Sequence, residues 1–402
     1  MKISLLTLYT PTHENVRGPS ALPYYLLKYR GSGIAVEVYS FNLNKVKDEQ
    51  ISWIERQLDL KITILKIPRW YCWIEKWKLT KIRVFLKYPL YCYIKPTKKH
   101  LKELTANQPD LIWRYPDFFI HVSEQLPQYK HIVTGPDCPA VVYFRQLNDS
   151  TGYKNLLFWM GLSKVAYGAI LQTKADRGKN VAYHVVGLND WRTLKRICPE
   201  KEVFFLLHPH YELKKNPTID FSGKRLKLLI AGKLDFYMQS GVNELLPVLR
   251  TMKSSVKEQY EMTLLGKGWE KVCAQLNAAG ILCKHISWVD DYVESISQYD
   301  IQLSPITVGG GMKGKVLDAL ANGLLVIGTE VALENIAVRN MESCVLYKNA
   351  IQLPAILESV LCNRKKYESI ARKGMEQART YHSPERISKR FFELVKKFIE
   401  HS

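Results

Sequence analysis

Short apolar runs alternate with longer helix-like stretches along the whole chain, and this alternation starts afresh once. The first series of candidate strands comprises KISLLTLY (2–9), IAVEVYSF (34–41), DLIWRY (110–115), HIVTG (131–135), GAILQT (168–173) and VAYHVVG (181–187). A polar stretch over 208–225 separates it from the second series, which comprises LKLLIAGK, YEMTLLGKG, ILCKHISWV, YDIQLSP, LLVIGTE and SCVLYK. Repeated strand–helix units build parallel sheets covered by helices, so the pattern predicts two Rossmann-like α/β domains in tandem.

Length and composition agree with two domains. A chain of 402 residues exceeds one ordinary hydrophobic core, and 47% apolar with 24% charged residues is typical of globular proteins. We expect an N-terminal domain over 1–212, a C-terminal domain over 213–380 and a closing helix over 381–402. The closing segment has a typical helix start at Ser383–Pro384 and an amphipathic spacing, and we expect it to pack back on the N-terminal domain.

Several features argue against a membrane span, an export signal and a structural metal. The most apolar stretch, 156–171, is short and carries Lys164 in its middle, which predicts a buried helix and not a span. The first residues lack the apolar core and cleavage site of a signal peptide. The eight cysteines form no C-x-x-C motif and no cluster with histidine at zinc-ligand spacing. This pattern favours a reducing compartment, so we expect a cytoplasmic protein without a metal.

The net charge of +20 is concentrated in the first half of the chain. Residues 66–99 hold ten Lys and Arg, a single acid, Glu75, and eight aromatic residues. Tryptophans and tyrosines among lysines suit the headgroup layer of an anionic membrane. An ordinary basic helix with its aromatics facing the core explains the composition equally well, and binding of single-stranded nucleic acid explains it less well. We expect an anionic membrane surface as a partner, on the inner face of the cell membrane, and no nucleic acid.

The stretch SPITVGGGMKGKVLDALANGLLVIG (304–328) is suited to hold a phosphate. Three consecutive glycines and two lysines, Lys313 and Lys315, stand between a strand pattern and a helix pattern. Glycines let the backbone approach a ligand closely, and the N–H groups of the first helical turn point toward it. A P-loop reading is possible because Gly309, Gly314 and Lys315 fit G-x-x-x-x-G-K. Val316, however, stands where that motif needs a hydroxyl for Mg²⁺, so an ATPase is disfavoured.

The same stretch resembles the donor site of retaining GT-B glycosyltransferases of glycosyltransferase family 4. That site has a glycine-rich loop, a lysine and a helix reading roughly K-x-x-E-A-[ML]-A-x-G-x-P-V-V, which Lys315, Asp318 and Gly323 match in order. The resemblance implies two Rossmann-like domains whose parallel sheets face each other across a cleft. It also implies that Asp318, one methylene shorter than the usual glutamate, binds the ribose hydroxyls. Gly310 stands where many members have a glutamate for the donor sugar, which leaves that contact to backbone N–H groups.

Further positions between residues 224 and 380 match the same family in order. Lys233 falls where a basic side chain meets the donor diphosphate, and Ser240–Gly241 replaces a usual Lys-Gly pair, so Lys313 is the expected second cation. Residues 285–305 resemble the segment that surrounds the nucleobase. The resemblance assigns donor binding to Gly232, Gly266, Gly309, Gly310, Gly311, Met312, Lys315, Asp318 and Glu334.

The resemblance implies transfer of a sugar from a nucleotide-sugar with retention and without a metal or cofactor. Helix N–H groups with Lys233 and Lys313 would stabilise the charge that develops on the leaving diphosphate. Gly18 and Arg114 are expected to line the acceptor site. Asp137, after a strand and a Gly–Pro turn, would orient the acceptor or accept its proton, although an ordinary turn or helix-cap role is slightly favoured.

We expect transfer to a glycan or lipid-linked acceptor, in the synthesis of a cell-surface polysaccharide of capsule or O-antigen type. Two alternatives remain. One is a sugar-nucleotide epimerase on the same double-Rossmann scaffold, which would need paired carboxylates in its site. The other is a non-catalytic protein that binds a nucleotide, glycan or nucleic acid on this scaffold.

Overall fold

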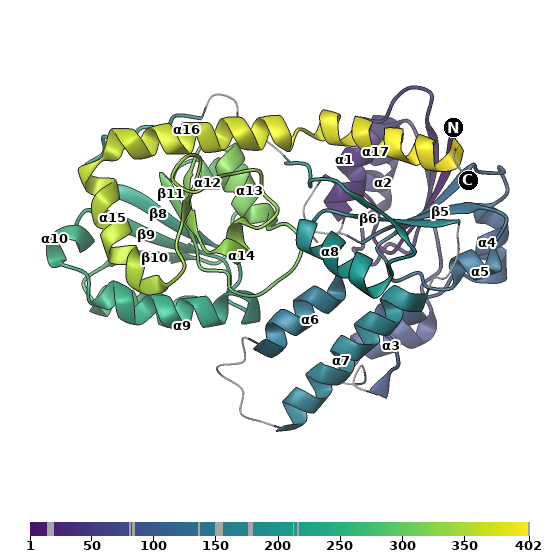
Figure 1. Ribbon diagram of the computed structural model, residues 1–402, viewed down its shortest axis with the longest axis horizontal. Helices are drawn as coiled ribbons and strands as arrows, with labels where there is room; N and C mark the ends of the chain where they lie inside the picture. Colours follow the sequence, from purple (N-terminus) through teal and green to yellow (C-terminus); the bar gives the residue numbers. More distant parts are fainter. Residues whose placement is uncertain are drawn as a thin grey trace. The chain divides into compact units, whose positions relative to one another are not determined.

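The computed structural model describes residues 1–13, 20–79, 82, 85–135, 137–148, 156–175, 180–211, 213–214 and 217–400 (Figure 1). The chain divides into two compact units. Unit 1 contains the described residues of Met1–Asn148, Tyr153–Pro209 and Pro384–Ser402, and unit 2 contains those of His210–Ser383. Each unit is an α/β domain built on one parallel sheet.

The sheet of unit 1 has seven strands in the order β3-β2-β1-β4-β5-β6-β7, and all its pairs are parallel. The strands are β1 (Lys2–Thr7), β2 (Ala35–Ser40), β3 (Lys61–Ile64), β4 (Leu111–Tyr115), β5 (Lys130–Thr134), β6 (Val181–Val185) and β7 (Glu202–Phe205). All residues of β4 and β6 and the last five residues of β1 are buried, as expected of parallel strands covered on both faces.

Helices from both ends of the chain cover this sheet. They are α1 (Ala21–Lys28), α2 (Asp48–Leu58), α3 (Arg69–Lys76), α4 (Lys98–Leu104), α5 (Val122–Gln125), α6 (Pro139–Asn148), α7 (Leu156–Ala175), α8 (Leu188–Ile197) and α17 (Pro384–Glu400), with a 3₁₀ turn η3 (Leu90–Tyr93). Helix α17 lies along α1 (Figure 1), and its Ser388 hydroxyl donates to the carbonyl of Leu26 at 2.7 Å. The ring of Phe391 packs against the buried Trp113 of β4 with centroids 4.9 Å apart. The last helix is therefore part of the core of unit 1.

Unit 2 has a six-stranded parallel sheet in the order β10-β9-β8-β11-β12-β13. Its strands are β8 (Leu226–Ala231), β9 (Tyr260–Leu265), β10 (Leu282–Ile286), β11 (Ile301–Ser304), β12 (Leu325–Gly328) and β13 (Val345–Leu346). Its helices are α9 (Phe236–Arg250), α10 (Ser254–Lys257), α11 (Glu270–Ala278), α12 (Tyr292–Ile296), α13 (Gly314–Ala321), α14 (Glu330–Leu333), α15 (Leu353–Cys362) and α16 (Arg364–Tyr381), with a 3₁₀ turn η4 (Ala350–Gln352). Two apolar clusters cover the sheet, one including α9, α11 and α15 and the other including α13.

The structure corrects the sequence analysis in two places within unit 1. The predicted strand GAILQT (168–173) is wrong, because these residues continue the 20-residue helix α7. The edge strands β3 and β7 were not predicted; each has four residues and is only partly buried, so its apolar signal is weak. Helix α7 is also not the buried helix that its composition predicts, since Leu156, Met160 and Tyr167 are exposed. Within the described residues, no helix has both the length and the apolarity to span a membrane.

Candidate active site

The strand order in unit 2 contains one switch point, between the neighbouring strands β8 and β11. From β8 the chain continues to β9 and β10 on one side, and from β11 it continues to β12 and β13 on the other. The loops that leave the carboxyl ends of β8 and β11 therefore lead to opposite sides of the sheet. Open α/β sheets bind their ligands at such a switch point. The loop after β8 contains Gly232 and Lys233, and the loop after β11 contains the three glycines of 309–311.

Glycine is required where the loops after β8 and β9 meet. Gly232 and Gly266 have φ values of +135° and +137°, a region that side chains disfavour. A Cβ atom added to Gly266 would lie 2.2 Å from the carbonyl oxygen of Gly232. That same oxygen accepts a hydrogen bond of 2.7 Å from the indole of Trp269, and His285 Nε2 lies 2.7 Å from the oxygen of Gly266. These contacts fix the course of both loops beside the switch point.

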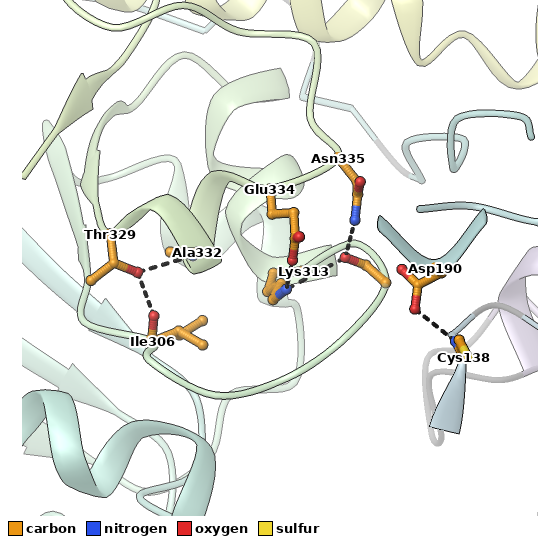
Figure 2. A network of polar contacts seen from close by, with 9 residues as sticks. Cys138, Asp190, Ile306, Lys313, Thr329, Ala332, Glu334 and Asn335 are labelled. Carbon is orange, nitrogen blue, oxygen red and sulfur yellow. Dashed lines mark hydrogen bonds and ion pairs between the residues drawn. The ribbon is translucent and has the colours of Figure 1, made fainter. Parts of the chain in front are cut away.

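The glycine loop folds back on its own lysine. Gly309 and Gly311 have φ values of +141° and +55°. A Cβ atom at Gly309 would lie 3.5 Å from Cε of Lys313, so the lysine side chain runs along the loop. Its ammonium donates to the carbonyl of Gly311 at 3.4 Å, and the side-chain amide of Asn335 donates to the same carbonyl at 2.7 Å (Figure 2). The loop is thus held in shape from two sides.

Glu334 provides the charge that holds Lys313 in this place. The Nζ atom of Lys313 lies 3.4 Å from Oε2 of Glu334, and the two side chains are only 10% and 11% exposed (Figure 2). Glu334 directly follows α14, whose first turn is capped by Thr329: its hydroxyl accepts from the amide of Ala332 at 3.0 Å and donates to the carbonyl of Ile306. The loops after β11 and β12 are therefore joined by this pair and by the Thr329 hydroxyl.

A second group of polar side chains forms at the start of α13. Lys315 is exposed as a whole residue, and its ammonium lies 4.0 Å from the centre of the Tyr292 ring. Burial lowers the pKa of Lys315, and the charge of Asp318 opposes this change. Burial, and to a smaller extent Asp318, raises the pKa of Tyr292. A Cβ atom at Gly232 would lie 3.9 Å from Cδ of Lys315, so this lysine reaches from α13 to the loop after β8.

The remaining residues that we assigned to the donor lie around these groups. Lys233 is exposed beside Asp235. Burial raises the pKa of Asp235, and the Tyr237 amide and Lys233 offset only part of this rise. Gly310 is partly exposed in the glycine loop, and Met312 is partly buried against the apolar cluster that includes α13. The glycine of Ser240–Gly241 has a packing role, since a Cβ atom at Gly241 would lie 2.0 Å from the carbonyl oxygen of Pro305.

In unit 1 the corresponding switch point lies between β1 and β4. Gly18 lies outside the described residues. Arg114 is fully buried within β4, and its guanidinium donates to the carbonyl of Phe119 at 2.6 Å. The structure therefore does not support its placement on an acceptor surface: in a strand covered on both faces, the side chain points into the domain whichever face it takes. Asp137 is partly exposed directly before α6, after the carboxyl end of β5.

Two carboxylates near Asp137 were not found by sequence reasoning. Asp117 follows β4, and a Cβ atom at Gly135 would lie 3.2 Å from its Cγ, so Asp117 lies at the same sheet edge. The pattern Pro-Asp directly after a buried strand was the available signal. Asp190 of α8 is buried and accepts from the amide of Cys138 at 2.7 Å, directly before α6 (Figure 2). Burial, with Asp190 adding to it, raises the pKa of Cys138 to about 12.

Across the parts of the chain that the structure describes, no group of three His, Cys, Asp or Glu side chains is arranged to hold a metal ion.

Comparisons with known proteins agree on the fold. The family described as "Glycosyl transferase-like" matches residues 246–393. No curated protein matches the chain in sequence. Among solved structures, HepE of Anabaena in complex with UDP has a TM-score of 0.64 at 12% identity, over 99% of this chain and 100% of that one. HepE is also known in complex with UDP-glucose, with a TM-score of 0.65.

Two further structures are similar over nearly their whole length. Sucrose-phosphate synthase of Thermosynechococcus elongatus has a TM-score of 0.64 at 13% identity, over 100% of both chains. WaaG, a glycosyltransferase involved in lipopolysaccharide biosynthesis, has a TM-score of 0.58 at 15% identity, over 96% of this chain and 98% of that one. With a parallel-sheet α/β domain in each unit, the chain has the GT-B fold of glycosyltransferases.

Proposed function

We propose that the protein is a glycosyltransferase that moves a sugar from a nucleotide-sugar to an acceptor hydroxyl with retention, in the manner of glycosyltransferase family 4. One observation carries the proposal. The glycine loop, with Lys313 inside it and Lys315 at the start of α13, lies at the switch point of unit 2 beside the Gly232 loop. A diphosphate in front of α13 would meet backbone N–H groups at its helix N-terminus and fixed positive charge.

The two loop lysines have different surroundings and would play different parts. Glu334 already balances the charge of Lys313, so this lysine mainly keeps the loop open and adds a polarised N–H donor. Lys315, which reaches the Gly232 loop, and the exposed Lys233 within that loop would bind the diphosphate oxygens. No metal or cofactor would be needed, because these groups can stabilise the negative charge that develops on the leaving diphosphate.

For the nucleotide, UDP is the first candidate, because HepE has been solved with UDP and UDP-glucose. The base would lie against the segment after β10, where Trp288 is exposed, and Asp318 would bind the ribose hydroxyls. The acceptor would bind to unit 1 at the carboxyl ends of β4 and β5, with Asp137 orienting it or accepting its proton and Asp117 as a second carboxylate.

The acceptor that fits best is a glycan or a lipid-linked glycan in the synthesis of a surface polysaccharide of capsule or O-antigen type. We propose that residues 66–99 bring the protein to the anionic inner face of the cell membrane, as a peripheral cytoplasmic protein. The structure supports one point of this: Trp70 and Trp73 of α3, and Trp77 directly after it, are exposed, whereas an ordinary basic helix would bury them. Aromatic rings beside lysines are suited to lipid headgroups.

A thermal-shift screen with UDP, GDP, TDP, CMP and ADP tests the donor site. A ligand at one hundred times its Kd stabilises the native protein by about 2.7 kcal/mol, which shifts the Tm by several degrees. We expect one nucleoside diphosphate to give such a shift and Lys315→Ala or Lys313→Ala to remove most of it. No shift with any of them would refute the donor site.

Turnover separates the enzyme from its alternatives. Hydrolysis or transfer of the sugar from the matching nucleotide-sugar supports the transferase, and Asp137→Asn should then lower kcat by about 10²-fold or more without changing the nucleotide-induced shift. Stabilisation without turnover would support the non-catalytic alternative, and inversion of a sugar carbon without transfer would support the epimerase.

A further inference from the structure

We propose that the outward face of α7 inserts into the interface of an anionic lipid bilayer, as a second membrane contact beside residues 66–99. The inference rests on the membrane association proposed above and adds to it an element that the sequence assigned to the core. It does not depend on the donor site, which lies in unit 2.

The exposed residues of α7 form one stripe. Leu156, Met160 and Tyr167 are 70%, 61% and 61% exposed, and their separations of four and seven residues place them on the same face of the helix. The exposed Lys174, eighteen residues after Leu156, lies on that face as well, and Lys164 lies at its border. The sequence of α7 contains no acid. Three large apolar side chains in such a stripe are unusual on a surface that only water covers.

The side of α7 next to this stripe packs against the basic and aromatic segment. Gly168 is buried, and a Cβ atom there would lie 2.9 Å from the carbonyl oxygen of Lys87, so the backbones touch. The ammonium of Lys164 lies 5.9 Å from the centre of the Phe85 ring, which is itself 80% exposed. The stripe on α7 is therefore continuous with the segment that follows α3. Figure 1 shows that the amino end of α7 extends away from the sheet of unit 1.

The chemistry of this combined surface favours lipid. Trp70 and Trp73 of α3 and Trp77 directly after it recur at helical spacing and are exposed, while Tyr71 and Ile74 are buried. The single acid in 66–99, Glu75, is paired with Lys45 at 3.7 Å. Rings could stack on nucleobases, but Leu156 and Met160 would gain nothing there and gain from contact with acyl chains. An apolar stripe bordered by cations on an acid-poor face is the pattern of an interfacial helix.

Co-sedimentation with vesicles tests the inference, using phosphatidylcholine alone and phosphatidylcholine mixed with phosphatidylglycerol. We expect binding to the mixed vesicles and a loss of roughly tenfold or more in the double variant Met160→Glu, Tyr167→Glu, because two apolar contacts are removed and two negative charges face anionic lipid. Ile351→Glu is the matched control, since Ile351 is 72% exposed but lies in unit 2. It should bind as the wild type does, and the variants should keep the nucleotide-induced Tm shift.

The double variant Lys76→Ala, Lys78→Ala measures the contribution of charge separately. It should bind the mixed vesicles more weakly than the wild type, and its binding should depend less on salt concentration. If the α7 variant binds vesicles as tightly as the wild type while this lysine variant does not, α7 does not insert and only residues 66–99 dock. If the α7 substitutions weaken binding of a single-stranded oligonucleotide, or convert a dimer to a monomer, and leave vesicle binding unchanged, the stripe has another occupant and the proposal fails.

Discussion

Lys313 and Glu334 are 21 residues apart in the chain, belong to the loops after two neighbouring strands, and meet as an ion pair of 3.4 Å with both side chains about nine-tenths buried. Through this pair the position of the glycine loop after β11 depends on the loop after β12. A buried pair is costly to break on one side only, because the remaining charge keeps its desolvation penalty and loses its partner. The glycine loop should therefore be sensitive to substitutions at Glu334, a residue outside it.

Glu334→Gln should destabilise the protein by about 3 kcal/mol, because it leaves the Lys313 ammonium nearly buried without its carboxylate. Urea unfolding followed by circular dichroism measures this change. The double variant Lys313→Ala, Glu334→Ala should be less destabilised than the two single alanine variants added together. Glu358→Gln is the control, because the Lys253–Glu358 pair of 2.8 Å is exposed and its loss should not be measurable. Equal effects at both pairs would contradict a buried, structural role for Lys313–Glu334.

Gly266→Ala should damage the site through the backbone. The new Cβ would need to lie 2.2 Å from the Gly232 oxygen at a φ of +137°, so the loop after β8 must move, at a cost of about 2 to 3 kcal/mol. We expect a lower Tm together with a weaker nucleotide-induced shift. Gly33→Ala in unit 1 is the control, since a Cβ there meets nothing within 4 Å and should change neither quantity. Unchanged nucleotide binding in Gly266→Ala would show that the Gly232 loop takes no part in binding the donor.

Most of the fold could be predicted from the sequence because parallel strands are apolar on both faces and give continuous runs, as in LIWRY and LVIG. The same property limits the prediction. GAILQT is equally apolar, yet it continues α7, because a short apolar run does not distinguish a strand from one face of a helix. The burial of Arg114 could not be predicted either, since a strand that is buried on both faces shows no alternation of apolar and polar residues.

The candidate site could be located by sequence but not assembled from it. The glycine loop is recognisable because its residues are contiguous and stand between a strand and a helix. The pairing of Lys313 with Glu334 and the contact of Lys315 with Tyr292 depend on how separate loops meet above the sheet, and no spacing encodes that. A lysine that the sequence offers as a free cation is thus placed by the structure in a balanced pair.

Cys138 should be unreactive although it lies beside the proposed acceptor site. Burial raises its pKa to about 12, so the thiol stays protonated and enclosed at pH 8. Iodoacetamide treatment of the native protein, followed by peptide mass spectrometry, should label the exposed Cys72 and Cys362 and leave Cys138 unlabelled until denaturant is added. Asp190→Asn replaces the charged acceptor of the Cys138 amide by a neutral one and should lower stability by about 1 kcal/mol. Rapid native labelling of Cys138 would show that this region opens.

Asp318 should distinguish nucleotides by their ribose hydroxyls. Asp318 is only 6% exposed, and it lies close enough to Lys315 and Tyr292 to affect the pKa of both. In the proposed donor site, the ribose hydroxyls would donate to its carboxylate. If UDP is the ligand, the wild type should bind it on the order of tenfold more tightly than 2′,3′-dideoxy-UDP, because hydrogen bonds to a charged acceptor are strong. Asp318→Asn should weaken the binding of UDP and leave the binding of the dideoxy analogue nearly unchanged. The two affinities measured by calorimetric titration should therefore converge. Asp291→Asn, at the cap of α12, is the control for a local structural effect and should keep the preference. A variant at Asp318 that lowers both affinities equally would assign the carboxylate to packing of α13 and not to the ribose.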